Sequence, residues 1–299
     1  MKCASVAIIG RPSSGKSTLI NTICESKISI TSPVPQTTRN AIRGIYTDQR
    51  GQLIFTDTPG WHISEKDFNR RMQEIAVSSL EDCDAVVYVI DATRKAGEEE
   101  DAISFMLSGL SVPVVCAVNK KDILSSQQLE DAHSYLRLHV PGRAVFDISA
   151  ADDDGIDELL IELFSKAPDG ELLYDESART DQNLEFRISE IIREKAINCV
   201  RDEIPHSIRV DIADLEYNEE KNRVWIRAFI IVERESQKAI LVGKGGATVK
   251  SIRVATFKEL KSVFPDSVIY VDLRVRVDAK WKTDSITLSK IFKSSFQNS

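Results

Sequence analysis

The sequence predicts an α/β domain, with a mostly parallel sheet and helices on both faces, followed by a smaller α+β domain. Three observations lead to this prediction. A short apolar strand at 4–9 runs into a glycine-containing loop and then a helix. Nearly unbroken apolar runs at 85–91 and 112–118 are typical of buried parallel strands, and a helical pattern at 98–110 separates them. From residue 184 the order becomes helix, strand, strand, helix, helix, strand.

The composition is that of a soluble globular protein. The chain has 299 residues, of which 42% are hydrophobic and 28% charged, and this length suffices for two domains. No apolar run approaches the roughly 18 residues of a membrane span, and the N-terminus enters a strand almost at once, so we expect no targeting segment. The five cysteines lack CxxC and metal-ligand spacing, which favours reduced thiols in a cytoplasmic protein.

The charge is distributed unevenly. Residues 1–170 carry 17 basic and 25 acidic side chains, a net charge of −8, whereas residues 236–299 carry 12 and 5, a net charge of +7. The basic C-terminal quarter favours an anionic partner. An ordinary solvated surface would explain the same count.

The loop after the first strand fits the phosphate-binding pattern of two glycines followed by Lys and Ser. Its glycines let several N–H groups point at one anion, and the following helix adds its partial positive charge. Lys16 is expected to reach the β and γ phosphates, and the Ser17 hydroxyl to bind Mg²⁺. The alternative is a plain turn between a strand and a helix. The residues predicted to hold nucleotide here are Gly10, Arg11, Pro12, Ser13, Ser14, Gly15, Lys16, Ser17 and Thr18.

A loop at 28–39, rich in Pro, Ser and Thr, follows the first helix. Its position suggests a segment that nucleotide orders. Thr38 is the candidate for the hydroxyl that closes onto Mg²⁺ and the γ-phosphate, with Thr37 as the near competitor.

Strands at 41–46 and 52–56 form a predicted hairpin that ends in Asp57, Thr58, Pro59 and Gly60. Asp57 can hold Mg²⁺, usually through water, and the Gly60 N–H can sense the γ-phosphate. The predicted metal ligands are therefore Ser17, Thr38 and Asp57, and the predicted catalytic residues are Lys16, Thr38 and Gly60.

Trp61 follows, at the position where many small GTPases carry a glutamine that orients the attacking water. Indole cannot accept a proton, so slow unaided hydrolysis is expected, or a water-positioning group from elsewhere in the chain or from a partner. A helical run at 66–80 comes next.

The second decisive motif is Asn119, Lys120, Lys121 and Asp122, at the end of a predicted buried strand. The Asp122 carboxylate can accept from N1–H and the exocyclic amine of guanine, which adenine does not offer. Asn119 is expected to tie this loop to the phosphate loop, and the Lys120 stem to lie over the base. After a strand at 144–148, Ser149 and Ala150 could offer an N–H to guanine O6, and a helix at 153–165 closes the domain.

The domain limits are predicted as 1–168 for the nucleotide-binding domain, 169–183 for a linker and 184–299 for the second domain with a C-terminal tail. The second domain begins with a helix at 184–200, followed by strands at 207–212 and 224–232 joined by a turn at 217–222. Two later helices flank a Gly-x-x-Gly loop, and a strand at 268–277 follows, which is the order of a type II KH domain. Taken alone, Gly-x-x-Gly is explained as often by a helix C-cap turn. The predicted RNA-binding residues are Gly243, Lys244, Gly245, Gly246, Lys250 and Arg253.

Over essentially its full length the chain resembles the Era family of bacterial GTPases, which carry a C-terminal KH domain and belong with the TrmE-Era-EngA-like GTPases. Besides the motifs above, the stretches at 189–195, 203–207 and 268–281 carry the resemblance. It implies a P-loop GTPase that uses GTP, GDP and Mg²⁺. It also implies binding to the 3′ end of 16S ribosomal RNA and to the 30S subunit, in small-subunit maturation under nucleotide control. The resemblance further implies a cytoplasmic protein with peripheral contact at the inner membrane, and we expect a monomer.

Two positions depart from the family pattern. Ser13 and Ser14 stand where the family usually has Asn-Val, and Glu185 precedes Phe186 where Arg is usual. Two other hypotheses stay open: a binding module for which GTP is a structural ligand, and a tRNA-modifying or membrane-signalling GTPase.

Overall fold

The computed structural model describes residues 1–32, 34, 37–61, 67–202, 204–218 and 220–293. Contacts within the chain divide it into two compact units. The first comprises Met1–Ser29 and Thr38–Asp181, and the second Ile30–Thr37 and Gln182–Ser299. Several predicted positions lie outside the described residues, namely Lys66 at the start of a helix, Glu203, Glu219 in a turn, and Pro33, Pro35 and Gln36 of the polar loop.

The first unit is built on a sheet in the order β2-β3-β1-β4-β5-β6. The pairs of neighbouring strands are parallel except for β2 and β3, which are antiparallel. Its strands are β1 (Lys2–Ile9), β2 (Ile42–Asp48), β3 (Gly51–Asp57), β4 (Ala85–Asp91), β5 (Val114–Asn119) and β6 (Ala144–Asp147). Every residue of β3, β4 and β5 is buried, as the apolar runs at 85–91 and 112–118 predict for β4 and β5.

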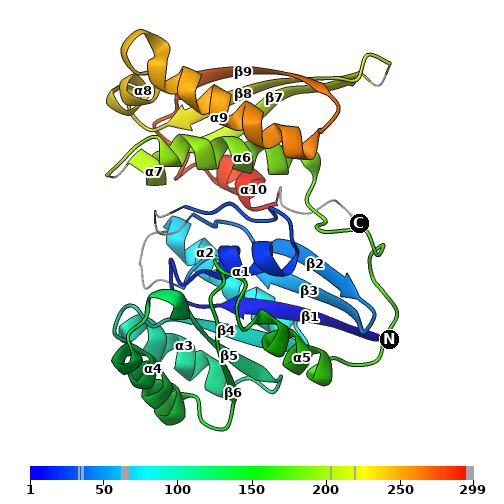
Figure 1. Ribbon diagram of the computed structural model, residues 1–299. Coiled ribbons are helices and arrows are strands. Elements are labelled where there is room, and N and C mark those ends of the chain that lie inside the picture. The colour runs from blue at the N-terminus through cyan, green and yellow to red at the C-terminus, as the bar shows by residue number, and fades with distance from the viewer. Residues whose placement is uncertain (33, 35–36, 62–66, 203, 219, 294–299) are drawn as a thin grey trace. The chain divides into compact units, whose positions relative to one another are not determined.

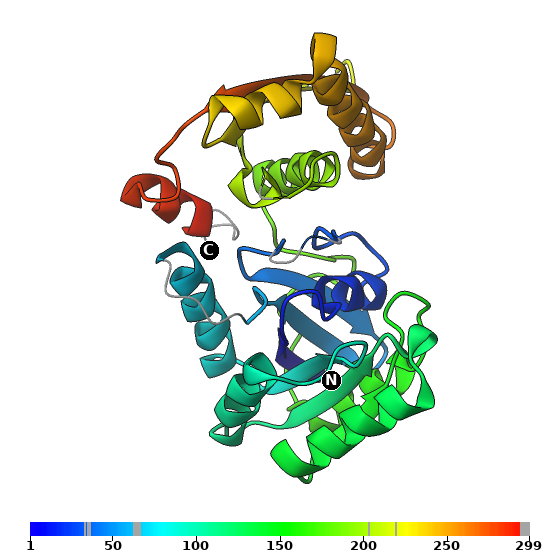
Figure 2. The ribbon, with the colours of Figure 1, turned by 90° about the vertical axis from the view of Figure 1, so that its left-hand side faces the viewer.

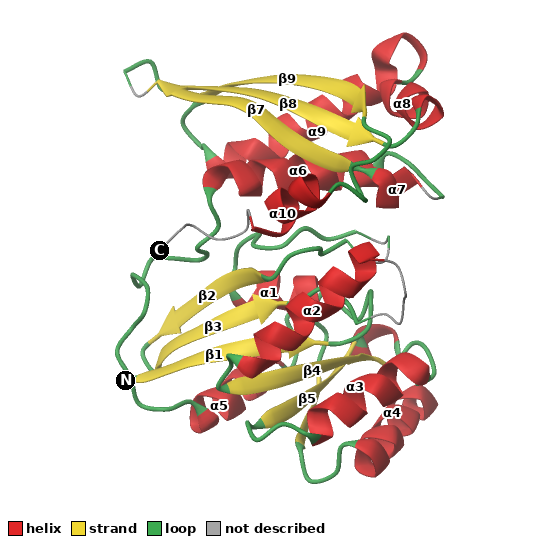
Figure 3. Cartoon of the chain, turned by 180° about the vertical axis from the view of Figure 1, so that it is seen from behind, coloured by secondary structure: helices red, strands yellow, loops and turns green. Residues whose placement is uncertain are grey.

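Helices cover both faces of this sheet. Figures 1 and 3 show α1 (Lys16–Ile23) and α5 (Ile156–Lys166) on one face, with α2 (Asp67–Glu81), α3 (Glu98–Ser108) and α4 (Ser126–His139) on the other. Figure 2 views the same unit from the side, with α1 and α2 on opposite sides of the strands. A short 3₁₀ helix, η1 (Lys121–Ile123), follows β5.

The strand ends gather the candidate nucleotide residues at one edge. The pairing register places Ile8 beside Asp57 and Asp91 beside Asn119, both across parallel strands. The carboxyl ends of parallel strands meet at one edge of a sheet, where α/β folds bind ligands. The candidate site therefore lies at the carboxyl edge.

The second unit has a three-stranded sheet in the order β7-β8-β9. Its strands are β7 (Arg209–Asn218), β8 (Arg223–Val232) and β9 (Val268–Val277). β7 and β8 are antiparallel, whereas β9 runs parallel to β8 because α8, η2 and α9 carry the chain back between them. The helical elements are α6 (Leu184–Asn198), α7 (Ile204–Ser207), α8 (Glu235–Val242), η2 (Lys244–Gly246), α9 (Ala247–Val263) and α10 (Ser285–Lys293).

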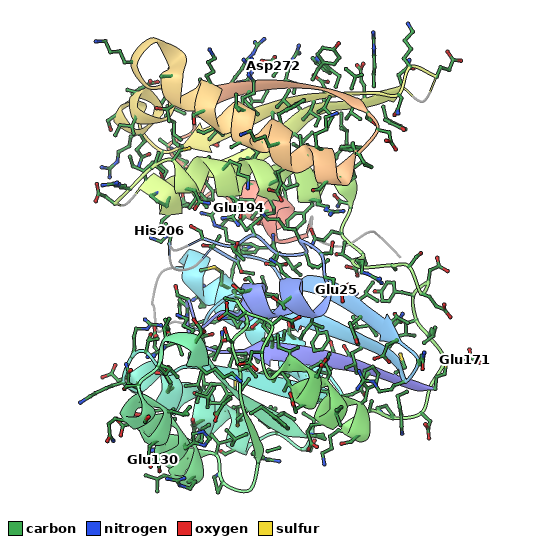
Figure 4. All side chains as sticks on the ribbon, in the orientation of Figure 1. Glu25, Glu130, Glu171, Glu194, His206 and Asp272 are labelled. Atoms are coloured by element: carbon green, nitrogen blue, oxygen red, sulfur yellow. The ribbon has the colours of Figure 1, made fainter. Side chains whose placement is uncertain are left out.

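One face of this sheet packs on helices (Figure 3). Alternate residues of β8, such as Ile226 and Ile230, are fully buried in one cluster with Ile192 of α6 and Ile252 of α9. The opposite face is polar in part: Asp272 of β9, labelled in Figure 4, accepts a hydrogen bond from Arg227 Nε at 3.2 Å. This alternation is expected of a sheet with one buried face.

The observed elements differ from the predictions in a few places. α5 begins at Ile156 and not near 153, because Asp153 and Gly155 have φ values of 56° and 76°, outside the helical range. β7 runs on to Asn218, which shortens the predicted turn. α4, α7 and α10 were not predicted, and Ser207, predicted as the first residue of a strand, is the last residue of α7.

Candidate functional site

The phosphate loop joins β1 to α1 in an unusual backbone conformation. Ser13 and Gly15 have φ values of 63° and 98°. A Cβ at Gly15 would stand 2.1 Å from Asn119 Nδ2, which itself donates to Ser14 O at 2.9 Å. Both the positive φ and the close approach require glycine at this position. Thr18 follows in the first turn of α1.

Lys16 is buried and folds back onto the loop. Its Nζ donates to Gly10 O at 2.9 Å and to Arg11 O at 3.0 Å. Burial lowers the pKa of Lys16 to about 8, although the nearby Asp57 acts in the opposite direction. Among the described residues the ammonium group therefore has two carbonyl partners that phosphate oxygens could replace.

Arg11 faces away from the phosphate position. Its guanidinium forms a buried ion pair with Glu100, with Nε to Oε1 at 2.7 Å, and donates from Nη2 to Asp91 O at 2.7 Å. Only the backbone of Arg11 can therefore face a phosphate group. The side chain instead holds the loop against the end of β4.

Three oxygen-bearing side chains converge beside Lys16. Ser17 Oγ donates to Asp57 Oδ2 at 2.6 Å, and Thr38 Oγ1 lies 2.9 Å from Ser17 Oγ and 3.4 Å from the same carboxylate oxygen. Thr37 is not part of this group, since its hydroxyl donates to Val34 O at 2.7 Å. Oxygen donors are the ligands that Mg²⁺ prefers.

The Asp57 carboxyl fits a cation or its bound water. Burial raises its pKa, against the lowering by Lys16 and the hydroxyls. Its second oxygen, Oδ1, is buried and has no hydrogen-bond partner among the described residues. A buried carboxylate oxygen left this way needs a positive or donating partner. The residues present therefore fit Mg²⁺.

Ser29 belongs to this cluster and was missed by the sequence reasoning. It is buried, and its Oγ donates to Asp57 Oδ2 at 2.8 Å. Asn21 fixes Ser29, because Asn21 Nδ2 donates to Ser29 O and Asn21 Oδ1 accepts from Ser29 N, both at 2.8 Å. The only available signal was that Asn21 follows Ser17 by four residues and so shares its helix face.

The Asp57–Gly60 turn lies directly against the phosphate loop. A Cβ at Gly60 would come within 2.7 Å of Pro12 Cα, and Trp61 N donates to Gly10 O at 3.1 Å. Thr58 Oγ1 donates to Ile8 O at 2.7 Å, and Pro59 completes the turn. Any movement of the turn is therefore transmitted to the loop.

Trp61 packs into the apolar cluster beside β4, which includes Tyr88 and Ile90. Its indole Nε1 is buried and has no hydrogen-bond partner within the described part of the chain. A side chain held in this way cannot align an attacking water.

The residues predicted to read the base lie after β5 and β6. Ser149 Oγ donates to Asp122 Oδ1 at 2.7 Å, and Lys120 has a φ of 69° with its Nζ donating to Asp91 Oδ2 at 2.8 Å. Ala150 N donates to Asn119 Oδ1 at 2.9 Å, and Ser149 N to Asp154 O at 2.9 Å. Both amides proposed for guanine O6 thus have partners within the protein, so contact with O6 requires one bond to be shared or exchanged.

The Gly-x-x-Gly loop lies between α8 and α9. Gly243, Gly245 and Gly246 have φ values of 73°, 63° and 80°. A Cβ at Gly243 would stand 2.3 Å from Thr248 Oγ1, whereas Gly245 and Gly246 have nothing within 4 Å of that position. The backbone of the last two glycines is therefore open to close approach by a ligand.

Lys244, Lys250 and Arg253 accompany this loop on η2 and α9. All three side chains are exposed, and the described residues include no ion-pair partner for any of them. Exposed, unpaired cations beside an open glycine backbone suit a phosphate chain.

Comparison with known proteins places these motifs in one family. A family model for 50S ribosome-binding GTPases matches residues 5–120, and a KH-domain model matches residues 203–282. GTPase Era of Treponema denticola is 47% identical over 293 residues, which cover 97% of this chain and 99% of that protein. This chain belongs to the Era family of GTPases.

Two solved Era structures are similar over nearly the whole chain. One is an Aquifex aeolicus Era variant bound to GDP·AlF₄⁻, with a TM-score of 0.92. The other is Era in complex with MgGDPNP and nucleotides 1506–1542 of 16S ribosomal RNA, with a TM-score of 0.93. Each is 33% identical and covers 99% of this chain and 100% of its own.

Membership of the Era family confirms the predicted fold class, a P-loop GTPase domain followed by a KH domain. It also confirms the predicted activity and cofactors: the chain is a GTPase that uses GTP, GDP and Mg²⁺.

The two departures from the Era pattern lie in the phosphate loop and at the start of α6. Ser13 is exposed at its positive φ, while Ser14 is buried and its hydroxyl has no partner among the described residues. Glu185 lies in the first turn of α6, where the helix dipole favours an acidic side chain. None of these three residues disturbs the contacts described above.

Proposed function

We propose that this Era-family GTPase binds the 3′ end of 16S ribosomal RNA through its Gly243–Gly246 loop and acts in maturation of the 30S subunit under nucleotide control. The observation that carries the proposal is the open glycine backbone of this loop, flanked by unpaired cations. The related Era complex with nucleotides 1506–1542 of 16S ribosomal RNA supports the choice of RNA.

The chain's own residues prepare the hydrolysis of GTP. In this proposal Lys16 exchanges its carbonyl partners for phosphate oxygens, and the N–H of Gly60, whose backbone lies close to Pro12, senses the γ-phosphate. Ser17, Thr38 and Asp57 would hold Mg²⁺, which, when bound, neutralises charge on the β and γ phosphates. Because Trp61 cannot position water, we expect slow unaided turnover.

The loop at 30–37 offers a route for nucleotide control. The residues at its two borders, Ser29 and Thr38, have hydroxyls on the same oxygen of Asp57. The loop itself groups with the second unit, where Arg193 Nη2 donates to Thr37 O and Ser32 Oγ donates to Asn198 Oδ1 at 2.8 Å. A change at Asp57 therefore reaches a segment that α6 holds; Glu194 of this helix, labelled in Figure 4, accepts from Thr31 N at 3.3 Å.

The test is binding of labelled RNA from the 16S 3′ end in the presence of GDPNP, GDP or no nucleotide. We expect binding with GDPNP to be at least about tenfold tighter than with GDP, a coupling of the size usual for switches. Equal binding in all three conditions would refute nucleotide control but not RNA binding itself. No binding in any condition would refute the RNA proposal.

A second candidate is a binding module in which GTP is a structural ligand and turnover is incidental. The apolar packing of Trp61 favours it, since no glutamine stands there to orient water. Single-turnover hydrolysis with and without the RNA separates the two. A rate that rises with RNA supports the gated enzyme, whereas no turnover in either condition supports the module.

Peripheral contact with the inner membrane is the remaining finer proposal, together with a monomeric state. Among the described residues no helix is long and apolar enough to cross a membrane. α9 exposes Val254 and Phe257 beside Lys250 and Arg253, a composition that suits an anionic lipid surface. Sedimentation with anionic vesicles, against neutral vesicles as control, tests this contact, and equilibrium sedimentation of the protein tests the monomer.

A further inference from the structure

Asp91, the last residue of β4, is a buried carboxylate to which none of the sequence motifs assigns a role. Only 1% of its surface is exposed. Oδ1 accepts hydrogen bonds from the backbone N and the hydroxyl of Thr93. Oδ2 accepts from Lys120 Nζ at 2.8 Å and from Arg94 Nε at 3.3 Å. Both oxygens are thus fully occupied by donors, two of them cationic.

One side of this cluster leads to the base. Lys120 belongs to the guanine-reading motif, and its ammonium group ends on Asp91. A lysine side chain has four flexible carbons and a single point charge, so fixing the charge fixes the stem. The ion pair therefore determines where the aliphatic part of Lys120 lies.

The other side leads to the phosphates. Arg94 uses Nε for Asp91 and Nη2 for Pro12 O at 2.9 Å, in the phosphate loop. The backbone oxygen of Asp91 also accepts from Arg11 Nη2 at 2.7 Å. The same residue is therefore tied to the loop through two arginines.

We propose that Asp91 is a positioning residue for the nucleotide, which holds the Lys120 stem against the base and the Pro12 carbonyl in place at the same time. The proposal rests on the proposed role of Lys120 at the base. Both carboxylate oxygens of Asp91 accept from protein donors, so its loss should act through Lys120 and the loop and weaken the binding of base and phosphates together. Its effect should not depend on which Watson–Crick groups the base presents.

The charge state of Asp91 agrees with this role. Burial alone would raise its pKa, but hydrogen bonds from Lys120 and Thr93 outweigh that effect and hold the pKa below its usual value. Asparagine cannot replace it well, because Thr93 occupies one oxygen with two donors. The amide NH₂ would then face the ammonium of Lys120.

The test measures dissociation of fluorescent GDP from the full chain. Asp91→Asn should accelerate dissociation roughly 30-fold, the size expected for losing hydrogen bonds to a buried charge. The matched control is Asp84→Asn, just before the other end of β4, where the carboxylate accepts only Ser5 N at 2.8 Å in the contacts of the described residues. This variant should stay within about twofold of the parent chain.

Two further readouts distinguish positioning from a general loss of structure. The ratio of GDP to IDP affinity, which reports on Asp122, should not change in Asp91→Asn. In a Lys120→Met background the effect of Asp91→Asn should shrink to about a third or less, because one acts through the other. An unchanged dissociation rate, or an equal effect in both backgrounds, overturns the proposal.

Arg94→Ala keeps the test decisive if Asp91→Asn does not fold. The Arg94 side chain is half exposed, so its removal leaves the core intact. We expect dissociation to be at least about fivefold faster, from the loss of a charged hydrogen bond to the loop, with the GDP to IDP ratio unchanged. Dissociation at the parent rate would overturn the link from Asp91 to the phosphate loop.

Discussion

The chain contains two glycine-rich loops that each precede a helix, Gly10–Ser17 before α1 and Gly243–Gly246 before α9, and they are built in opposite ways. In the first loop Lys16 and Arg11 are buried and bonded inside the protein. In the second loop Lys244 is exposed, and so are the cations of α9 that follow it. We call Gly10–Ser17 the filled loop, because its cationic side chains bond to other groups of the protein. We call Gly243–Gly246 the open loop, because the cationic side chain of its Lys244 is exposed to solvent.

This difference matches the two kinds of ligand. A nucleotide is small and must be told apart from close analogues, which requires groups fixed in advance by internal bonds. An RNA strand is long and charged, so exposed cations supply affinity while the glycine backbone admits the strand. Substitutions in the first loop should therefore act through packing, and substitutions in the second through charge.

The largest effect is expected from Gly15→Ala. The added Cβ would meet Asn119 Nδ2 at 2.1 Å, at a φ of 98° that alanine avoids. We expect GDP affinity to fall by roughly 100-fold or more, since the loop and the base-reading motif are forced apart. The control is Gly109→Ala, where φ is −86° and the nearest atom is 3.6 Å away. Similar GDP affinities for Gly15→Ala and Gly109→Ala would refute the claim that the first loop depends on close packing.

Asp122→Asn tests how the nucleotide site selects guanine. The amide can donate to the 2-oxo group of xanthine, so preference should move from GTP toward XTP by roughly 100-fold. Competition binding with the two nucleotides measures the change. Ser149→Ala, which removes only the hydroxyl that donates to Asp122, serves as the control and should keep GTP preferred. An unchanged preference in Asp122→Asn would mean that another group reads the base.

Replacing Lys244 and Gly245 with Asp should abolish most RNA binding and leave GDP affinity within about twofold. Two negative charges would meet the phosphate chain, so we expect at least a tenfold loss of RNA affinity at moderate salt. In the parent chain the affinity should also fall steeply as salt rises. Lys238→Asp on α8, where the lysine is paired with Glu235 at 3.4 Å, is the control for charge reversal of a lysine away from the loop. Retained RNA binding in the double variant would place the clamp elsewhere.

Most of the fold could be predicted from the sequence because the hydrophobic pattern of each strand or helix matches the burial of that element in the structure. The strand at 268–277 has the predicted bounds, since apolar and charged residues alternate from Val271 to Val277 and the run contains neither glycine nor proline. α4 was missed because only Ala132 and Leu136 of its 14 residues are buried apolar positions, which leaves the helical period faint. α10 was missed because it follows the last recognised motif and lies in the segment treated as a tail.

The site was predictable where a motif carries its own chemistry and not where residues meet through folding. Lys16, Asp57 and Asp122 lie in sequence motifs whose residue types and spacing predict their roles. Ser29 and Asp91 lie in no such motif. Each was missed because its partner, Asp57 for Ser29 and Lys120 for Asp91, is 28 or 29 positions away in the sequence. The grouping of residues 30–37 with the second unit is equally invisible in a polar loop.

The buried lysine gives the filled loop a pH dependence. Lys16 has a lowered pKa of about 8 in the free protein, and bound phosphates would raise it. Binding above pH 8 therefore requires proton uptake, so GDP affinity should be constant up to about pH 8 and then fall by about tenfold per pH unit. Titration at constant Mg²⁺, with thermal unfolding to confirm that the protein stays folded, measures this. A flat profile to pH 9.5 would mean that Lys16 stays charged without phosphate.

The smallest effect, and the sharpest test of internal bonds, is expected from Ser29→Ala. It removes one of three hydroxyls on Asp57 Oδ2 without touching the predicted ligands Ser17 and Thr38. We expect the Mg²⁺ concentration needed to slow GDP release to rise about fivefold, the size of one hydrogen bond to a charged group. Ser108→Ala, whose hydroxyl bonds only within α3 in the described contacts, is the control. If the required Mg²⁺ concentration does not change, the Ser29 hydroxyl contributes only to packing. The cluster around Asp57 would then depend on fewer internal hydrogen bonds than its geometry indicates.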